Sequence, residues 1–354
     1  MSKKKINIFL PLCIIFSILY IFLAIKPLSK ELHYSSKWTI DCSKSTTNQD
    51  TEKSEFIPFR LGQTAGYFTE NGEILNTVTF PYKITISDNR YAYYGNNDKE
   101  ISFYTPTGSK EGVIKQQGFP FFQKNKLYIM KPGGSAFSEL NEDGSEKWSY
   151  ENYAPITAFS SSKSGTVSGY ADGTIIAFDN DGNKVQEYAP GGSDYPVILG
   201  IAISESGNYI ASVSGQDRQR FVLAKNTNKL TTILFHDFFK TSTTRQTYIK
   251  FSNDEKFVYY SHESCLGVLN CETLKNTHIP INGHIISIQQ SETSDIVFVL
   301  SKENDYYIVS IIEPHDNYAG SFKYKANHSF IKAKGNSLFI GRDNKISMIN
   351  VEYK

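Results

Sequence analysis

The chain has 354 residues, and 14% of them are aromatic, with 23 Tyr and 24 Phe against 3 Met. Aromatic side chains suit the half-buried surface of a β-sheet, so the composition favours an all-β protein. The 37 Lys and Arg residues balance the 36 Asp and Glu residues. This balance argues against a nucleic-acid partner, because phosphate binding requires clustered positive charge.

The N-terminus differs from the rest of the chain. Residues 1–5 read MSKKK and are expected to lie in the cytoplasm, and residues 6–25 carry no charge. Twenty helical residues span about 30 Å, so residues 6–25 are expected to form an uncleaved transmembrane helix in the cytoplasmic membrane. A cleaved signal peptide is the alternative, but its apolar region is shorter, and the bulky Phe22 stands where a small residue is needed. The flanking lysines predict a single pass with the remainder in the periplasm or the extracellular space.

Residues 26–55 are expected to be a polar tether, because they include the run KSTTNQDTEKSE and show no periodicity. Trp38 and Ile40 are isolated apolar residues within it. The three cysteines that follow the span are Cys42, Cys265 and Cys271, and this odd count predicts no disulfide framework. Their spacing also matches no zinc site.

Residues 56–354 are expected to form one β-propeller, since a short strand, a tight turn and another short strand recur throughout. A period near 40 residues with about four strands per unit is typical of propeller blades. Seven equivalent points predict seven blades, with an eight-bladed ring as the alternative. These points follow each other at spacings of 36 to 48 residues, at Ser87, Gln123, Ser160, Ser204, Ser252, Gln289 and Ala333.

The last copy, residues 331–351, supplies about three strands. Residues 73–80 are predicted to complete that blade as its outer strand, because ring closure leaves no open edge. The pairs Asp143-Gly144 and Asp181-Gly182 are predicted hairpin corners between third and fourth strands, where glycine adopts a positive φ at low cost.

The copy GTVSGYADGTIIAFDNDGNKVQEY, residues 165–188, resembles the repeat of quinoprotein-type (PQQ-like) propellers, in which two glycine turns bracket an apolar strand that ends in Asp. Residues 203–215 and 251–264 look more like WD40-type repeats. A membrane-tethered extracytoplasmic propeller is also similar in layout to the propeller subunit of the outer-membrane protein assembly machine. Quinoprotein enzymes hold their cofactor with a Trp platform, an adjacent Cys pair and acidic calcium ligands. Here Trp38 and Trp148 are the two tryptophans and no cysteines are adjacent, so no cofactor is expected.

Motifs for catalysis and metal binding are missing from the sequence. It contains no G-x-S-x-G elbow and no H-x-x-x-H pair. The turn at residues 180–183 lacks the twelve-residue calcium pattern. His278 and His284 flank a turn and are expected to make structural hydrogen bonds. We therefore expect no enzymatic activity, no catalytic residue and no metal site.

Long connections point to one face of the ring as the functional surface, because connections above the usual length often carry function. Residues 189–197, 216–220 and 235–245 are predicted to share that face. Aromatic residues beside arginines are typical interface anchors, although covering the blade is an alternative role for them. The predicted partner-binding residues are Asp194, Tyr195, Arg218, Arg220, His236, Phe238, Phe239 and Arg245.

The sequence thus predicts a non-catalytic binding or scaffold propeller. It would be anchored in the cytoplasmic membrane and would dock another cell-envelope protein through one face. An enzyme or small-ligand sensor that uses the central channel is the alternative, and it requires polar residues from several blades to converge on one cavity.

Overall fold

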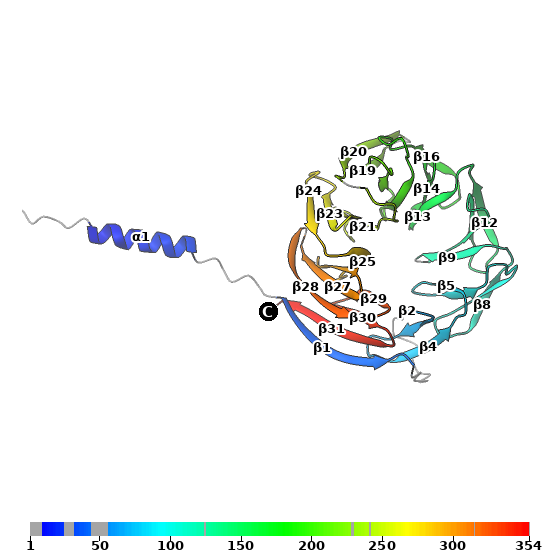
Figure 1. Cartoon of the computed structure of the whole chain (residues 1–354), viewed down its shortest axis with the longest axis horizontal. Coiled ribbons are helices and arrows are strands. Elements are labelled where there is room, and N and C mark those ends of the chain that lie inside the picture. The colour runs from blue at the N-terminus through cyan, green and yellow to red at the C-terminus, as the bar shows by residue number, and fades with distance from the viewer. Residues whose placement is uncertain are drawn as a thin grey trace, which may run out of the picture.

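The computed structural model describes residues 9–24, 32–43, 56–123, 125–227, 230–240, 242–314 and 316–353. The strands of these residues form eight sheets, which are arranged around a ring (Figure 1). Each sheet is one blade in which neighbouring strands run antiparallel. The expected β-propeller is confirmed. The number of blades is eight, which was the alternative, and the prediction of seven is wrong.

We number the blades in chain order. Blade 1 has three strands, β2 (Ile57–Leu61), β3 (Thr64–Phe68) and β4 (Ile74–Thr79). Blades 2 to 7 have four strands each. Blade 2 contains β5 (Lys83–Ile86), β6 (Tyr91–Tyr94), β7 (Ile101–Tyr104) and β8 (Lys110–Ile114); blade 3 contains β9 (Phe119–Gln123), β10 (Lys126–Met130), β11 (Ala136–Leu140) and β12 (Glu146–Glu151); and blade 4 contains β13 (Ile156–Ser162), β14 (Gly165–Tyr170), β15 (Ile175–Phe178) and β16 (Lys184–Tyr188). Blade 5 contains β17 (Ile198–Ile203), β18 (Tyr209–Ser214), β19 (Arg220–Thr227) and β20 (Leu230–Phe238); blade 6 contains β21 (Ile249–Phe251), β22 (Phe257–His262), β23 (Cys265–Asn270) and β24 (Asn276–Pro280); and blade 7 contains β25 (His284–Gln290), β26 (Val297–Glu303), β27 (Tyr306–Glu313) and β28 (Asn317–Lys325). Blade 8 is made of β29 (Ser329–Lys334), β30 (Ser337–Arg342), β31 (Lys345–Tyr353) and β1 (Leu32–Asp41).

The blade count from sequence missed blade 1 for a structural reason. All seven repeat points lie at or near the end of an innermost strand, from Ser87 after β5 to Ala333 in β29. The β3–β4 turn contains Gly72 with φ 85°, and the third-to-fourth turns of blades 3 and 4 contain Gly144 and Gly182 with φ 89° and 83°. This likeness identifies β3 and β4 as third and fourth strands. Blade 1 therefore has no innermost strand among the described residues. The repeat count relied on innermost strands, so it did not include this blade.

Ring closure differs from the prediction. Residues 73–80 do not complete the last blade, because β4 pairs with β3 in blade 1. The outer strand of blade 8 is β1, which pairs with β31 from Leu32↔Tyr353 to Asp41↔Lys345. β1 lies inside the expected polar tether, residues 26–55. A register shift between Ser36 and Trp38 breaks the alternation of β1, which explains why the strand was not recognised locally.

An ion pair connects blade 8 with blade 2. Lys332 Nζ on β29 lies 2.8 Å from Asp88 Oδ1 in the β5–β6 turn, so blades 8 and 2 contact each other past blade 1. Lys334 Nζ at the end of β29 lies 3.8 Å from Glu70 Oε1 in the β3–β4 turn. These contacts join the three blades at the closing side of the ring.

The core lies between neighbouring blades, where apolar side chains of one sheet pack on the next. The interface of blades 3 and 4 is aromatic, and Phe137 at its centre is fully buried. The Phe137 ring lies 5.0 Å from Phe159, 5.3 Å from Trp148 and 5.7 Å from Phe178, measured between centroids. Edge-to-face aromatic pairs of this kind stabilise a core beyond the area that they bury.

The N-terminal helix α1 spans Phe9–Ala24, 16 residues without a charged side chain. Within the part of the chain that the structure describes, no helix reaches the length and apolar character that crossing a membrane requires. Residues 6–8 and 25 of the expected span lie outside the described residues.

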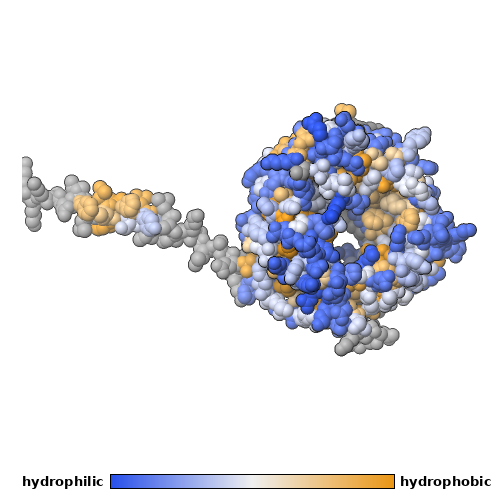
Figure 2. Space-filling model, in the orientation of Figure 1, coloured by the Kyte–Doolittle hydropathy of each residue, from blue (hydrophilic) through white to orange (hydrophobic). Residues whose placement is uncertain are grey.

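The antiparallel order gives the ring two distinct faces. We call the face that carries the blade-to-blade connections and the second-to-third-strand turns the connection face, and the opposite one the turn face. Residues 189–197, 215–219 and 239–248 join strands on the connection face, at that end of blades 4, 5 and 6. Of the predicted segment 235–245, residues 235–238 belong to β20 and residues 239–245 lie in the connection that follows it. Figure 2 shows that the ring is hollowed at its centre, with apolar residues along part of the opening.

Candidate functional site

The long connections of blades 4 to 6 are hydrogen-bonded into one surface. The amide of Gln216 donates to Tyr195 O at 3.0 Å, which joins the β18–β19 turn to the β16–β17 connection. The amide of Phe239 donates to Gln219 O at 2.9 Å, and Gln219 Nε2 donates to Thr243 O at 2.9 Å. The three predicted segments are therefore neighbours in space.

Four of the predicted residues meet around one aromatic ring. Phe238 is 38% exposed. The guanidinium carbon of Arg218 lies 5.0 Å from the Phe238 ring centroid, and that of Arg220 lies 5.4 Å from it. The His236 ring contacts Phe238 edge-on at 5.7 Å between centroids. We call Arg218, Arg220, His236 and Phe238 the rim patch. Cation–π stacking holds the two arginines at this ring.

The two arginines of the rim patch differ in burial. Arg218 is exposed, whereas Arg220 is only 9% exposed. Arg220 donates through Nη2 to Pro190 O, and its Nε is buried without a hydrogen-bond partner among the described residues. Gly192 adopts φ +88°, and a Cβ there would lie 3.1 Å from the guanidinium, so glycine lets the β16–β17 connection close over Arg220.

The other predicted residues do not join the rim patch. Tyr195 is 64% exposed on the β16–β17 connection, and the amide of Asp194 donates to Asp217 Oδ2 at 3.3 Å. Phe239 turns inward and stacks on His262 at 4.4 Å between centroids. Arg245 is exposed on the β20–β21 connection, and its charge helps lower the pKa of His284 after the larger effect of burial.

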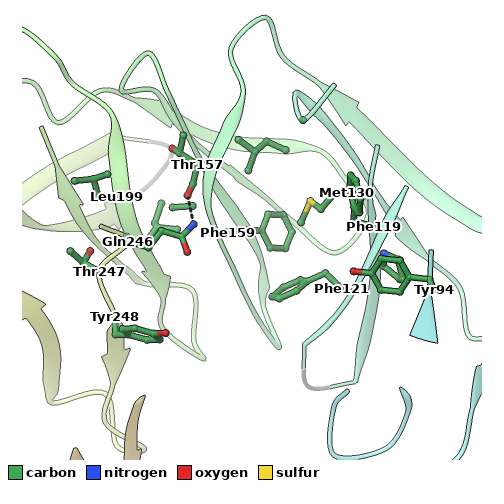
Figure 3. Close-up of a pocket in the computed structure, with 16 residues that line it drawn as sticks. Tyr94, Phe119, Phe121, Met130, Thr157, Phe159, Leu199, Gln246, Thr247 and Tyr248 are labelled. Carbon is green, nitrogen blue, oxygen red and sulfur yellow. Dashed lines mark hydrogen bonds between the residues drawn. The ribbon is translucent and has the colours of Figure 1, made fainter. Parts of the chain in front are cut away.

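A pocket at the channel mouth lies on the same face. Its volume is about 460 Å³, and none of the described residues that line it is charged. Figure 3 shows Phe121 and Phe159 side by side, with Tyr248 across the open space from them. We call it the mouth pocket. It is lined by Tyr94, Phe119, Pro120, Phe121, Met130, Gly134, Ile156, Thr157, Ala158, Phe159, Leu199, Gly200, Ile201, Gln246, Thr247 and Tyr248.

The mouth pocket is built by the beginnings of the innermost strands β9, β13 and β17 and by the residues just before β21. Phe121 and Phe159 contact edge-on at 5.8 Å between centroids, and Gln246 Nε2 donates to Thr157 O at 3.2 Å. Tyr248 stays 45% exposed and Phe121 36% exposed. Sequence reasoning missed this pocket, because its residues come from four blades and each aromatic fits an ordinary strand pattern. Aromatic residues at the starts of consecutive innermost strands were the available signal.

Comparison with known proteins agrees with this architecture. A family model described as a beta-propeller protein matches residues 1–353. The chain belongs to this β-propeller family.

Individual relatives of this propeller are distant. An uncharacterized protein of Treponema pallidum (strain Nichols) is 25% identical over 358 residues, which cover 99% of this chain and 95% of that protein. BamB from Moraxella catarrhalis has a TM-score of 0.63 at 13% identity and covers 90% of this chain and 100% of its own. A chain of the Mitotic Checkpoint Complex has a TM-score of 0.56 at 12% identity, with coverages of 87% and 100%. The two structural similarities show the fold alone.

Between blades 5 and 6 of this propeller, a chain of polar contacts runs beneath the connection face. Asp237 Oδ2 lies 3.0 Å from His278 Nε2, and His278 Nδ1 lies 2.7 Å from His262 Nε2. The carboxylate therefore fixes the tautomers: His278 Nε2–H donates to Asp237, and His262 Nε2–H donates to His278. His262 Nδ1 remains a buried acceptor without a partner among the described residues. Burial and the neighbouring His278 lower the pKa of His262 to about 4, against a smaller opposing effect of Asp237.

Acid should weaken the fold through His262. Because its pKa is about 4 in the folded state and about 6.5 when unfolded, the unfolded chain takes up the proton first as the pH falls through this window. Between about pH 7 and about pH 4.5, the wild type should lose about 2 kcal/mol more unfolding free energy than His262→Gln. Urea titrations of both proteins at the two pH values measure this difference. Equal losses in the two proteins would contradict the assignment.

Groups of three or more His, Cys, Asp or Glu side chains placed to hold a metal ion do not occur within the described ranges. The four cysteines, Cys13, Cys42, Cys265 and Cys271, are free thiols. The rim patch and the mouth pocket present aromatic, guanidinium and amide groups to a binding partner.

Proposed function

We propose that this protein is a non-catalytic binding or scaffold propeller that docks another cell-envelope protein through its connection face. The observation that carries the proposal is the mouth pocket, an aromatic cavity on the same face of the ring as the exposed Phe238 and Arg218, none of whose described lining residues is charged. Interfaces between proteins are enriched in Tyr, Phe and Arg, and their anchor side chains fill such pockets. The residue types of the rim patch and the mouth pocket match this composition.

The proposal includes attachment to the cytoplasmic membrane through residues 6–25, with the propeller in the periplasm or the extracellular space. The absence of charge from residues 6–25 and the three lysines before them support this arrangement. The membrane segment would concentrate the propeller near its partners at the cell envelope. The proposal assigns no enzymatic step and no cofactor to the propeller.

Photo-crosslinking in intact cells tests the docking surface. With p-benzoylphenylalanine at Tyr248 in the mouth pocket, we expect one discrete crosslinked envelope protein in membranes that keep the propeller after an alkaline wash. Phe121→Ser should reduce its yield about tenfold, since an anchor side chain would lose its aromatic contact. The matched control is Tyr318 on the turn face, because Tyr248 and Tyr318 are 45% and 46% exposed.

Two results would contradict this proposal. Equal yields of the same crosslinked protein from Tyr248 and Tyr318 would show that the connection face has no preference. An unchanged yield in Phe121→Ser would remove the role of the mouth pocket. The melting temperature of Phe121→Ser serves as the folding control.

A small-ligand sensor is the second candidate. It is favoured by the volume of the mouth pocket, about 460 Å³, which lies within the range of small-molecule sites. The polar groups that converge there are Thr157, Gln246 and Thr247. Mass spectrometry of the purified propeller distinguishes the two candidates, because a sensor would retain a compound that Phe121→Ser releases.

A further inference from the structure

We infer that the rim patch receives a carboxylate side chain of the docked partner, an inference that rests on the proposed docking function. Arg218 would make the contact, and Arg220 would add positive potential at the same Phe238 ring. The partner segment would thus combine a large apolar side chain, which enters the mouth pocket, with a nearby Asp or Glu.

The charges of the rim patch are unbalanced. Within the described part of the chain, neither Arg218 nor Arg220 forms an ion pair with a carboxylate of the propeller. The nearest acid along the chain, Asp217, accepts hydrogen bonds from the Ser193 hydroxyl and the Asp194 amide. The carboxylate of Asp217 is therefore engaged with the β16–β17 connection.

Burial makes the unpaired Arg220 costly. Arg220 is almost completely buried, its Nε has no hydrogen-bond partner among the described residues, and burial lowers the pKa of its guanidinium. An unpaired buried charge is unfavourable, and a nearby anion would compensate it. Arg218 holds its exposed guanidinium at the same ring, and this planar fork suits a carboxylate with two parallel hydrogen bonds.

The chain connects the rim patch to the mouth pocket directly. Phe238 ends β20, and the connection that follows it reaches Gln246, Thr247 and Tyr248, which line the mouth pocket. One extended segment lying along this connection would meet both sites. The pocket is uncharged, so the carboxylate belongs at the rim and the apolar side chain in the pocket.

Defined peptides test the inference with the full-length protein in detergent. One panel of acetylated, amidated peptides carries a phenylalanine and two glutamates at varied separations, and a matched panel carries glutamines instead. Fluorescence anisotropy should show the best glutamate peptide binding about tenfold more tightly than its glutamine counterpart, as expected for a charge-assisted contact. The preference should disappear in Arg218→Gln and shrink with added salt.

Controls separate this inference from the docking proposal. Lys110→Gln removes an exposed cation from the turn face and should keep the preference for glutamate. Equal binding of the two panels, no binding of either, or a preference that survives Arg218→Gln would overturn the inference, while the crosslinks from Tyr248 would still support docking. A lipid role would also overturn the inference. It would be shown if the protein bound vesicles containing phosphatidylglycerol but not phosphatidylcholine vesicles, and if Arg218→Gln abolished this binding, because the arginines would then recognise lipid phosphate.

Discussion

Replacing Phe137 with alanine is expected to lower the free energy of unfolding by about 3–5 kcal/mol, the usual cost of deleting a buried aromatic ring. Phe137 is fully buried between blades 3 and 4 and contacts Trp148, Phe159 and Phe178. Its removal leaves a cavity that two twisted sheets cannot easily collapse to fill. Chemical denaturation followed by tryptophan fluorescence measures the change, because Trp148 reports on this interface.

The matched control for Phe137 is Tyr153, a fully exposed aromatic residue between β12 and β13. Tyr153→Ala should change the unfolding free energy by less than about 0.5 kcal/mol. Phe137→Leu should fall between the two, since it retains part of the buried volume. A small effect of Phe137→Ala would mean that the blades repack readily, contrary to the packing described here.

Trp38→Ala should cost about 2–4 kcal/mol, because it weakens the closure of the ring. Trp38 on β1 lies 6.3 Å from Phe68 of blade 1 and 5.9 Å from Phe339 of blade 8, measured between centroids. Its Nε1 donates to Glu70 O at 3.1 Å. One side chain therefore links the N-terminal strand to both blades at the closing side, and the midpoint of urea unfolding should fall accordingly.

His33 provides the control on the same strand, because it pairs with Glu352 but its side chain is exposed. His33→Ala should leave the urea midpoint nearly unchanged. Trp38→Phe should recover part of the loss, since it keeps an aromatic ring without the donor to Glu70. If Trp38→Ala and His33→Ala unfold alike, β1 does not contribute to closure through this contact.

Local sequence patterns were sufficient for most of the fold. The alternating strands and the Asp-Gly corners at residues 143–144 and 181–182 identified the blades, because each blade is a local antiparallel unit. β1 was missed because it is completed by a partner far away in sequence and because its bulge disrupts the alternation. Blade 1 was missed because its described strands lack the innermost position on which the repeat count depended.

The structure brings four of the eight residues named from the sequence together, and the other four lie apart from them. Arg218, Arg220, His236 and Phe238 meet as a group because antiparallel pairing sets Arg220 at the start of β19 opposite Phe238 at the end of β20. Phe239, the first residue after β20, directs its ring onto His262 instead. The mouth pocket and the Asp237–His278–His262 chain join residues from different blades, and no local pattern displays such neighbours.

The pairing of β1 with β31 also constrains the order of folding. Asp41 pairs with Lys345, so β1 can pair in the ring only after a partner strand about 300 residues later in the chain has been synthesised. During synthesis, the blades between them can form in turn while the edge of β1 stays unpaired and open to misassociation. The last step of assembly is then a long-range docking event, and any factor that shields β1 until residues 345–353 emerge would raise the yield of closed rings.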